Sequence, residues 1–194
     1  MPMQRSDISG SFCVVAAIAI LLLPLKWLLA CAVAAVFHES CHLLALRLLG
    51  GRWQHVAVFA TGARIPIPEL SRGREAVCAL AGPLGGMLLL GLYPYFPLLA
   101  LCALVQSLYN LLPIYPLDGG RALQCVAQML LPPLYAQWLC EYVAYCCIGA
   151  ITAIAFYATL FGEWGILPLL VVLLLFGSRF AGKFPCKRAN LALQ

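Results

Sequence analysis

Residues 27–49 read WLLACAVAAVFHESCHLLALRLL, and this stretch decides the fold that the sequence predicts. It is apolar except for a polar cluster near its middle and Arg47 near its end, and it is long enough to cross about 30 Å of hydrocarbon as one helix. The cluster contains His38, Glu39 and His42. Ionisable groups are costly in hydrocarbon and are functional by default where they occur there. The stretch therefore predicts a membrane-spanning helix that carries a functional polar site.

The composition of the whole chain extends this prediction to all 194 residues. Hydrophobic residues make up 64% of the chain and charged residues 10%, whereas a soluble domain is about half apolar and about one quarter charged. This composition excludes a water-soluble globule. The net charge of +5 is spread thinly over loops, so a nucleic-acid partner is also excluded. We predict a single membrane-embedded domain over residues 1–194.

Apolar runs between polar, proline and glycine residues predict six transmembrane helices. A further short helix is expected over 118–131, separated from the fourth span by Pro113 and Pro116, which interrupt helical hydrogen bonding. The predicted fold class is therefore an all-α membrane protein. The six expected spans cover residues 8–24, 27–49, 75–92, 96–112, 134–161 and 164–180.

The distribution of basic residues predicts the orientation. If the amino terminus is cytoplasmic, eleven of the twelve Lys and Arg residues lie on the cytoplasmic side and only Lys26 lies outside. Cytoplasmic loops of membrane proteins carry such an excess of basic residues. Both termini are therefore expected in the cytoplasm, including a basic tail over 181–194.

Residues 50–68 are too short and too polar to span a membrane, and they predict a membrane-associated β-hairpin between the second and third spans. Pro66 and Pro68 cannot donate to a strand ladder, so the second arm is expected at an edge. Two interpretations stay open at this point: a plain surface hairpin, or an edge that accepts an extended peptide as an added strand. Outside this segment, most of the ten cysteines lie in apolar runs and are expected to be free packing residues.

The polar cluster has the spacing of a zinc site. Residues four apart lie on one face of a helix, so His38 and His42 can reach the same ion while Glu39 stands beside it to activate water. A catalytic zinc site usually has three protein ligands, and the candidate for the third is Asp118, in the segment NLLPIYPLDGGR over 110–121. Taken alone, that segment is also compatible with an ordinary loop turn.

Three motifs together resemble the site-2 protease family of intramembrane zinc metalloproteases. They are His38-Glu39-x-x-His42, Ala81-Gly82-Pro83, and the Asn-x-x-Pro-x-x-Pro-Leu-Asp-Gly-Gly run that begins at Asn110. The resemblance covers a catalytic core over 27–131 and is greatest to the stage IV sporulation protein FB group, here without the CBS domain that such proteins often carry.

This resemblance implies a role for each matching residue. His38, His42 and Asp118 would bind one Zn²⁺ ion, Glu39 would be the general base, and Asn110 would hold the substrate. The 50–68 hairpin would receive the substrate as an extended strand. The family often has an asparagine after its Gly-Pro, whereas this chain continues Leu84-Gly85-Gly86, so a polar contact from that position is in doubt.

The function expected from these features is an intramembrane zinc endopeptidase that cleaves a transmembrane or membrane-associated protein by zinc-activated water. The expected partners are that substrate, the lipid bilayer, and regulatory or inhibitory membrane proteins. The resemblance implies a bacterial cell membrane, such as the one around a forespore, and a substrate such as a pro-sigma factor. The alternative is a metal-binding membrane protein without proteolytic activity, either a transporter or an inactive protease scaffold. A transporter would favour polar groups along several spans, whereas here they concentrate at one centre.

Overall fold

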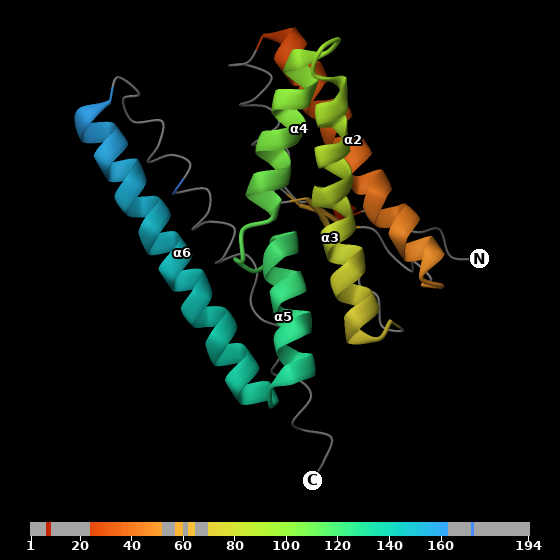
Figure 1. Ribbon diagram of the computed structural model, residues 1–194, viewed down its shortest axis with the longest axis vertical. Helices are drawn as coiled ribbons and strands as arrows, with labels where there is room; N and C mark the ends of the chain where they lie inside the picture. Colours follow the sequence, from red (N-terminus) through yellow and green to blue (C-terminus); the bar gives the residue numbers. More distant parts are fainter. Residues whose placement is uncertain are drawn as a thin grey trace. The chain divides into compact units, whose positions relative to one another are not determined.

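The computed structural model describes residues 7–8, 24–51, 57–59, 62–64, 70–162 and 172. The chain divides into two compact units, 1–144 and 145–194, and all the predicted site residues lie in the first. Within the described residues there are five α-helices and one short 3-10 helix (Figure 1). They are α2 (Leu25–Leu48), α3 (Arg72–Leu88), η1 (Leu89–Leu92), α4 (Pro97–Asn110), α5 (Asp118–Leu130) and α6 (Pro133–Phe161).

Prolines set several of the helix boundaries. Pro24 precedes α2, while Pro97 and Pro133 are the first residues of α4 and α6. Proline suits the first turn of a helix because its missing N–H would have no partner there and its φ is already helical. Pro83 is an exception because it lies inside α3, as is tolerated in membrane helices whose neighbours compensate for the lost hydrogen bond.

Helix α2 has its polar residues inside and its large apolar residues outside. Ala34, His38, His42 and Leu46 recur every four residues and form its buried face. The other side carries exposed aliphatic residues, among them Val36 at 68% exposure. A helix in water shows the reverse pattern. This distribution is typical of a helix that is surrounded by lipid.

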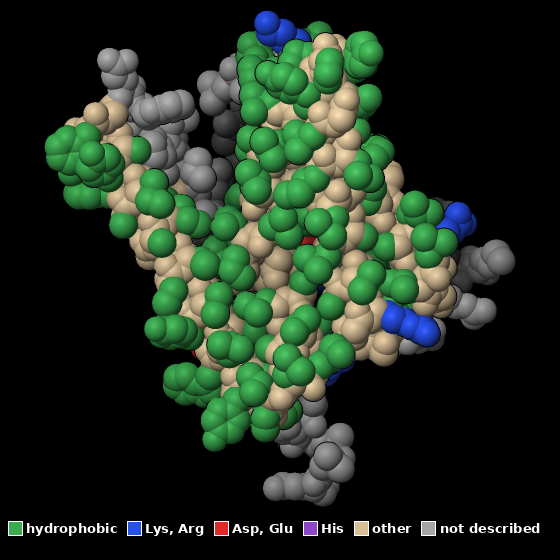
Figure 2. All heavy atoms as spheres, in the orientation of Figure 1, with side chains coloured by type: hydrophobic (Ala, Val, Ile, Leu, Met, Phe, Trp, Pro, Cys, Tyr) green, Lys and Arg blue, Asp and Glu red, His purple; other side chains and the backbone are tan. Residues whose placement is uncertain are grey.

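Helix α3 is the centre of the first unit. It contacts α2, α4 and α5, and α2 also contacts α4. The residues buried between these helices are small, for example Ala79 of α3 and Ala100 and Ala103 of α4. Small side chains let helix backbones approach closely, as is common in membranes. In the face that Figure 2 shows, hydrophobic side chains cover most of the surface and Lys and Arg lie at its edges.

The prediction of six transmembrane helices is wrong. Within the described residues, three helical segments are long and apolar enough to cross a membrane: Leu25–Leu48, Arg72–Leu92 and Pro133–Phe161. Helix α4 has 14 residues, because irregular backbone from residue 111 interrupts the apolar run that the sequence presents as one span. Ile8, the expected start of a first span, lies in a strand. The rest of the expected spans 8–24 and 164–180 falls outside the described residues, apart from Pro24 and Val172.

The predicted hairpin also needs correction, because three short strands form one sheet in the order β1-β2-β3. Strands β2 (Ala57–Phe59) and β3 (Gly62–Arg64) pair antiparallel, and β1 (Asp7–Ile8) pairs parallel with the other edge of β2. An isolated two-stranded hairpin is only marginally stable. A pairing partner some fifty positions earlier leaves no local trace in a sequence pattern, so the sequence indicated the hairpin alone. The remainder of 50–68 lies largely outside the described residues, as does the predicted tail 181–194.

Candidate metal centre

Two imidazoles meet on the buried face of α2. His38 and His42 are 2% and 8% exposed, and their ring centroids lie 4.8 Å apart with the ring planes nearly perpendicular. The spacing of four residues places one ring above the other along the helix. Their Nε2 atoms are 3.1 Å apart. Both nitrogen atoms therefore face the same point.

Asp118 reaches this point from the break between α4 and α5. Helix α4 ends at Asn110, and Asp118 is the first residue of α5. Between them the backbone turns tightly through hydrogen bonds from Ile114 N to Leu112 O and from Leu117 N to Ile114 O. A Cβ atom at Gly119 would collide with the carbonyl of Leu111. Glycine at this position therefore lets the new helix begin close enough to the turn for Asp118 to face α2.

The three candidate ligand atoms form a nearly equilateral triangle. Asp118 Oδ2 lies 3.1 Å from the Nε2 atom of His38 and 3.1 Å from that of His42. The side chains of all three residues are at most 13% exposed. Zinc bonds of about 2.0–2.1 Å to nitrogen and oxygen place tetrahedral ligands about 3.3–3.4 Å apart. The residues present therefore match the size and donor type of a three-ligand zinc site.

A hydrogen bond from His42 to α3 determines which of its nitrogen atoms faces the triangle with a lone pair. His42 Nδ1 lies 2.7 Å from the carbonyl oxygen of Cys78, and because a carbonyl only accepts, Nδ1 is the donor. Neutral His42 consequently carries a lone pair on Nε2. Metal-binding histidines usually donate their other ring N–H in this way, which fixes the tautomer and the ring orientation.

This tautomer creates a conflict that a cation resolves. The lone pair of His42 Nε2 points toward the carboxylate of Asp118 at 3.1 Å, and two acceptors at that distance repel each other. A proton on Nε2 would remove the repulsion between one pair of atoms. A metal ion relieves all three pairs at once, because His38 Nε2 converges on the same point. The three residues therefore offer the donor types and the spacing that could hold a metal ion.

Glycine in α3 makes room for the ligands of α2. A Cβ atom at Gly82 would collide with the imidazole of His42 at Nε2. One turn further, a Cβ atom at Gly85 would collide with the thiol of Cys41, so this thiol packs against α3. Within the described residues, all eight cysteines are free.

The other two predicted site residues, Glu39 and Asn110, lie in α2 and at the end of α4. Glu39 follows His38 on α2 and is half-buried. Asn110 is half-buried at the end of α4, directly before the turn that leads to Asp118. The sequence interpretation did not identify the Cys78 carbonyl as a partner of a ligand, because a backbone acceptor has no signature in residue type. It named Gly82 only as part of a motif, without its contact to His42.

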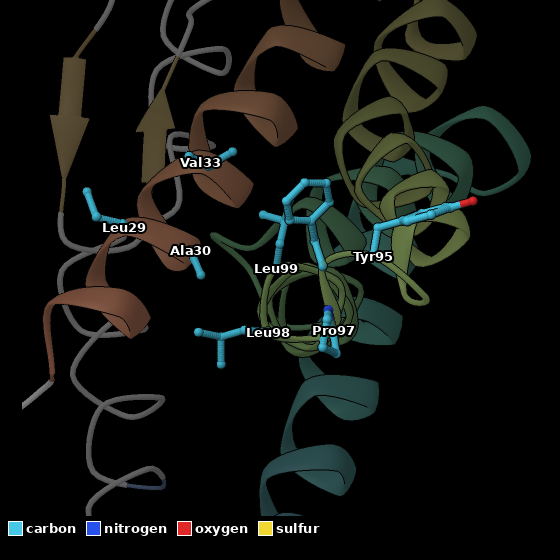
Figure 3. A pocket seen from close by; sticks show the side chains of 8 residues that line it. Leu29, Ala30, Val33, Tyr95, Pro97, Leu98 and Leu99 are labelled. Atoms are coloured by element: carbon cyan, nitrogen blue, oxygen red, sulfur yellow. The ribbon is translucent and has the colours of Figure 1, made fainter.

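A separate cavity lies beside the N-terminal part of α2 (Figure 3). Its volume is about 450 Å³, and none of the predicted site residues lines it. Its walls come from the N-terminal part of α2, from the two residues before α4 and from the first turn of α4, and their side chains are almost entirely apolar. The lining residues are Leu29, Ala30, Val33, Tyr95, Phe96, Pro97, Leu98 and Leu99. The cavity offers no donors for a metal.

Comparison with solved structures finds a protein with the same fold. The chain resembles the site-2 protease from Methanocaldococcus jannaschii with a TM-score of 0.60 and 22% sequence identity, over 88% of this chain and 85% of that one. No family model matches the chain, and no curated protein does so either. At this identity the likeness establishes a shared fold. It does not address the narrower sporulation group that the sequence suggested.

Proposed function

We propose that this chain is an intramembrane zinc endopeptidase of the site-2 protease type. One observation carries the proposal: Nε2 of His42 lies 3.1 Å from a carboxylate oxygen of Asp118 in a buried site, while Nδ1 of the same ring is bonded to the Cys78 carbonyl. His38 Nε2 completes the donor set. The shared fold with a site-2 protease supports the same conclusion.

The proposed reaction is hydrolysis of a peptide bond. A zinc ion held by His38, His42 and Asp118 would act as a Lewis acid and would lower the pKa of a water molecule to about 7. Glu39, next to His38 on α2, takes a proton from the attacking water. The oxygen of that water bonds to the scissile carbonyl carbon, the C–N bond breaks, and Glu39 passes the proton to the leaving amine.

Asn110 is proposed to position the substrate. It stands at the end of α4, at the entrance to the turn that delivers Asp118. Its side-chain amide can donate to a substrate carbonyl and accept from a substrate N–H. This role would orient the scissile bond while the three ligands hold the metal.

The proposed substrate is a membrane protein that unwinds locally. The exposed aliphatic face of α2 and the three candidate spans support a site within the bilayer. A peptide bond in a transmembrane helix is shielded by the helix itself, so it must leave helical geometry before it can react. Strand β3 pairs with β2 on one side, and its other edge is the proposed place where an unwound segment adds as a strand.

The finer features of this proposal rest on the sequence. They are cytoplasmic termini, a bacterial cell membrane, regulatory membrane partners, membership in the stage IV sporulation protein FB group, and a substrate such as a pro-sigma factor. Each concerns the setting of the enzyme and not its chemistry. The test of function is therefore designed to need none of them.

The test compares wild-type protein with Glu39→Gln after both are reconstituted with native membranes. The metal content is measured by elemental analysis, and new peptide termini are identified by mass spectrometry without assuming a substrate. We expect one zinc ion per chain in both proteins and new membrane-protein fragments with the wild type alone. Glu141→Gln is the matched control, because Glu141 lies in α6 and bonds to Gln137. It should cleave like the wild type.

Two outcomes would overturn the assignment. Fragments that appear equally with Glu39→Gln would show that the proposed base is not required. Zinc bound by both proteins without any wild-type fragment would favour the non-proteolytic alternative, a transporter or an inactive scaffold.

A further inference from the structure

Two buried polar atoms close to the metal centre have no hydrogen-bond partner among the described residues. They are His38 Nδ1 and Ser107 Oγ. His38 is 2% exposed and Ser107 is 0% exposed. Buried polar atoms in proteins nearly always have a partner, either a protein group or an ordered water molecule. Two such atoms in one region therefore indicate that an ordered water molecule hydrogen-bonds to both of them.

The two metal-binding histidines differ in this respect. His42 donates from Nδ1 to the Cys78 carbonyl. His38 presents its Nε2 atom to the same triangle, so metal binding requires its proton to be on Nδ1 as well. That N–H has no hydrogen-bond acceptor among the described residues. A metal-binding histidine usually donates a hydrogen bond from its other ring N–H. Among the described residues, only His42 has a partner for that bond.

Gly86 of α3 shows that the two unpaired atoms flank the same space. A Cβ atom at Gly86 would lie 2.5 Å from Ser107 Oγ and 3.8 Å from His38 Nδ1. The two atoms can be no farther apart than the sum of these distances, and neither makes a hydrogen bond with the other. One water molecule can bridge polar atoms across such a gap. Glycine is the residue that leaves this space free of a side chain.

We propose that Ser107 positions the metal ligand His38 through one buried water molecule beside Gly86. The Nδ1–H group of His38 donates a hydrogen bond to the water, and the water donates one to the hydroxyl oxygen of Ser107. This holds the ring in the tautomer and orientation that direct Nε2 to the metal. The inference rests on the proposed metal site, and it assigns to α4 a role in ligand orientation that Cys78 of α3 performs for His42.

The test measures metal binding and needs no substrate. The affinity for Zn²⁺ is measured by competition with a chromophoric chelator, and the visible spectrum of the Co²⁺-loaded protein reports ligand geometry. We expect Ser107→Ala to lower the Zn²⁺ affinity by about 10- to 100-fold, as is typical when the partner of a ligand is lost. The Co²⁺ spectrum should also change. Ser107→Thr keeps the hydroxyl and should restore most of the affinity.

Ser40→Ala provides the matched control. Ser40 lies between the two histidines in sequence, but its hydroxyl donates to the Val36 carbonyl on the exposed side of α2. Its loss should leave the affinity and the Co²⁺ spectrum unchanged. Thermal unfolding of the metal-free proteins shows whether each variant folds, and Ser107→Ala should unfold at the wild-type temperature or above it.

The outcomes separate this inference from the proposed function. If wild-type protein binds no Zn²⁺, both are overturned. If the wild type binds Zn²⁺ and folded Ser107→Ala has the same affinity and Co²⁺ spectrum, the positioning role alone is wrong. If Ser107→Ala fails to fold, the Zn²⁺ affinity of Ser107→Thr decides. The proposal requires this variant to keep most of the wild-type affinity because it keeps the hydroxyl, and a loss as large as that expected for Ser107→Ala would contradict it.

Discussion

His42 of α2 donates a hydrogen bond from Nδ1 to the backbone carbonyl of Cys78 in α3, over 2.7 Å. This bond links the metal centre to the helix that contacts α2, α4 and α5. Because it fixes the proton of His42 on Nδ1, the ring can give a lone pair to the metal only through Nε2. The orientation of His42 in the site therefore depends on the distance between α2 and α3.

The first prediction concerns Gly82, which allows this close approach. A methyl group in Gly82→Ala would meet Nε2 of His42, so the imidazole must move away from the metal position. We expect Zn²⁺ affinity to fall by at least about 10- to 100-fold. Competition with a chelator measures the change. The control is Gly91→Ala, because a Cβ atom there meets no other atom within 4 Å. Equal affinities of the two variants would contradict the prediction.

The second prediction concerns removal of the metal. A ligand that binds only the folded state stabilises it by about 2.7 kcal/mol at a free concentration of 100 times Kd. Wild-type protein loaded with Zn²⁺ should therefore unfold at a lower temperature after a chelator is added. Asp118→Asn removes the anionic oxygen from the triangle, so its unfolding temperature should not respond to Zn²⁺ or to the chelator. A chelator effect of equal size in both proteins would place the metal elsewhere.

The third prediction concerns the start of α5. In Gly119→Ala the new methyl group would collide with the backbone carbonyl of Leu111, which cannot rotate aside. We expect the variant to lose about 1–3 kcal/mol of stability, as overpacking typically costs, and to bind Zn²⁺ weakly because Asp118 moves with the helix. Thermal unfolding and chelator competition measure the two effects. If Gly119→Ala had the stability and the Zn²⁺ affinity of the wild type, the prediction would be wrong, because the start of α5 would then accommodate a methyl group.

The fourth prediction concerns the lipid-facing side of α2. Val36 is 68% exposed near the middle of the helix, where an arginine costs about 2.5–3.5 kcal/mol on insertion into a membrane. Val36→Arg should reduce the fraction of protein that is integrated and resists alkaline extraction. Leu48→Arg at the end of α2 is the control, since an arginine there can reach the interface. Equal integration of the two variants would argue against a transmembrane α2.

The sequence predicted the local parts of this protein well. The four-residue spacing of His38 and His42 is a helical period, so their common face follows from the sequence as soon as the segment is helical. The composition and the apolar runs indicated membrane helices. The fourth expected span was wrong because hydropathy does not register where α4 stops, at Asn110, and where irregular backbone begins.

The sequence by itself determined which residues are able to bind a metal and that helices would present them in an apolar setting, because residue type and helical period are local properties. Only the tertiary structure decided that Asp118 meets two imidazoles some eighty positions earlier, that a backbone carbonyl orients His42, and that Ser107 faces His38 across Gly86. These relationships depend on how closely four helices pack and on the angle of one turn. Packing distances of this kind arise from the sum of many small contacts, which no single motif contains.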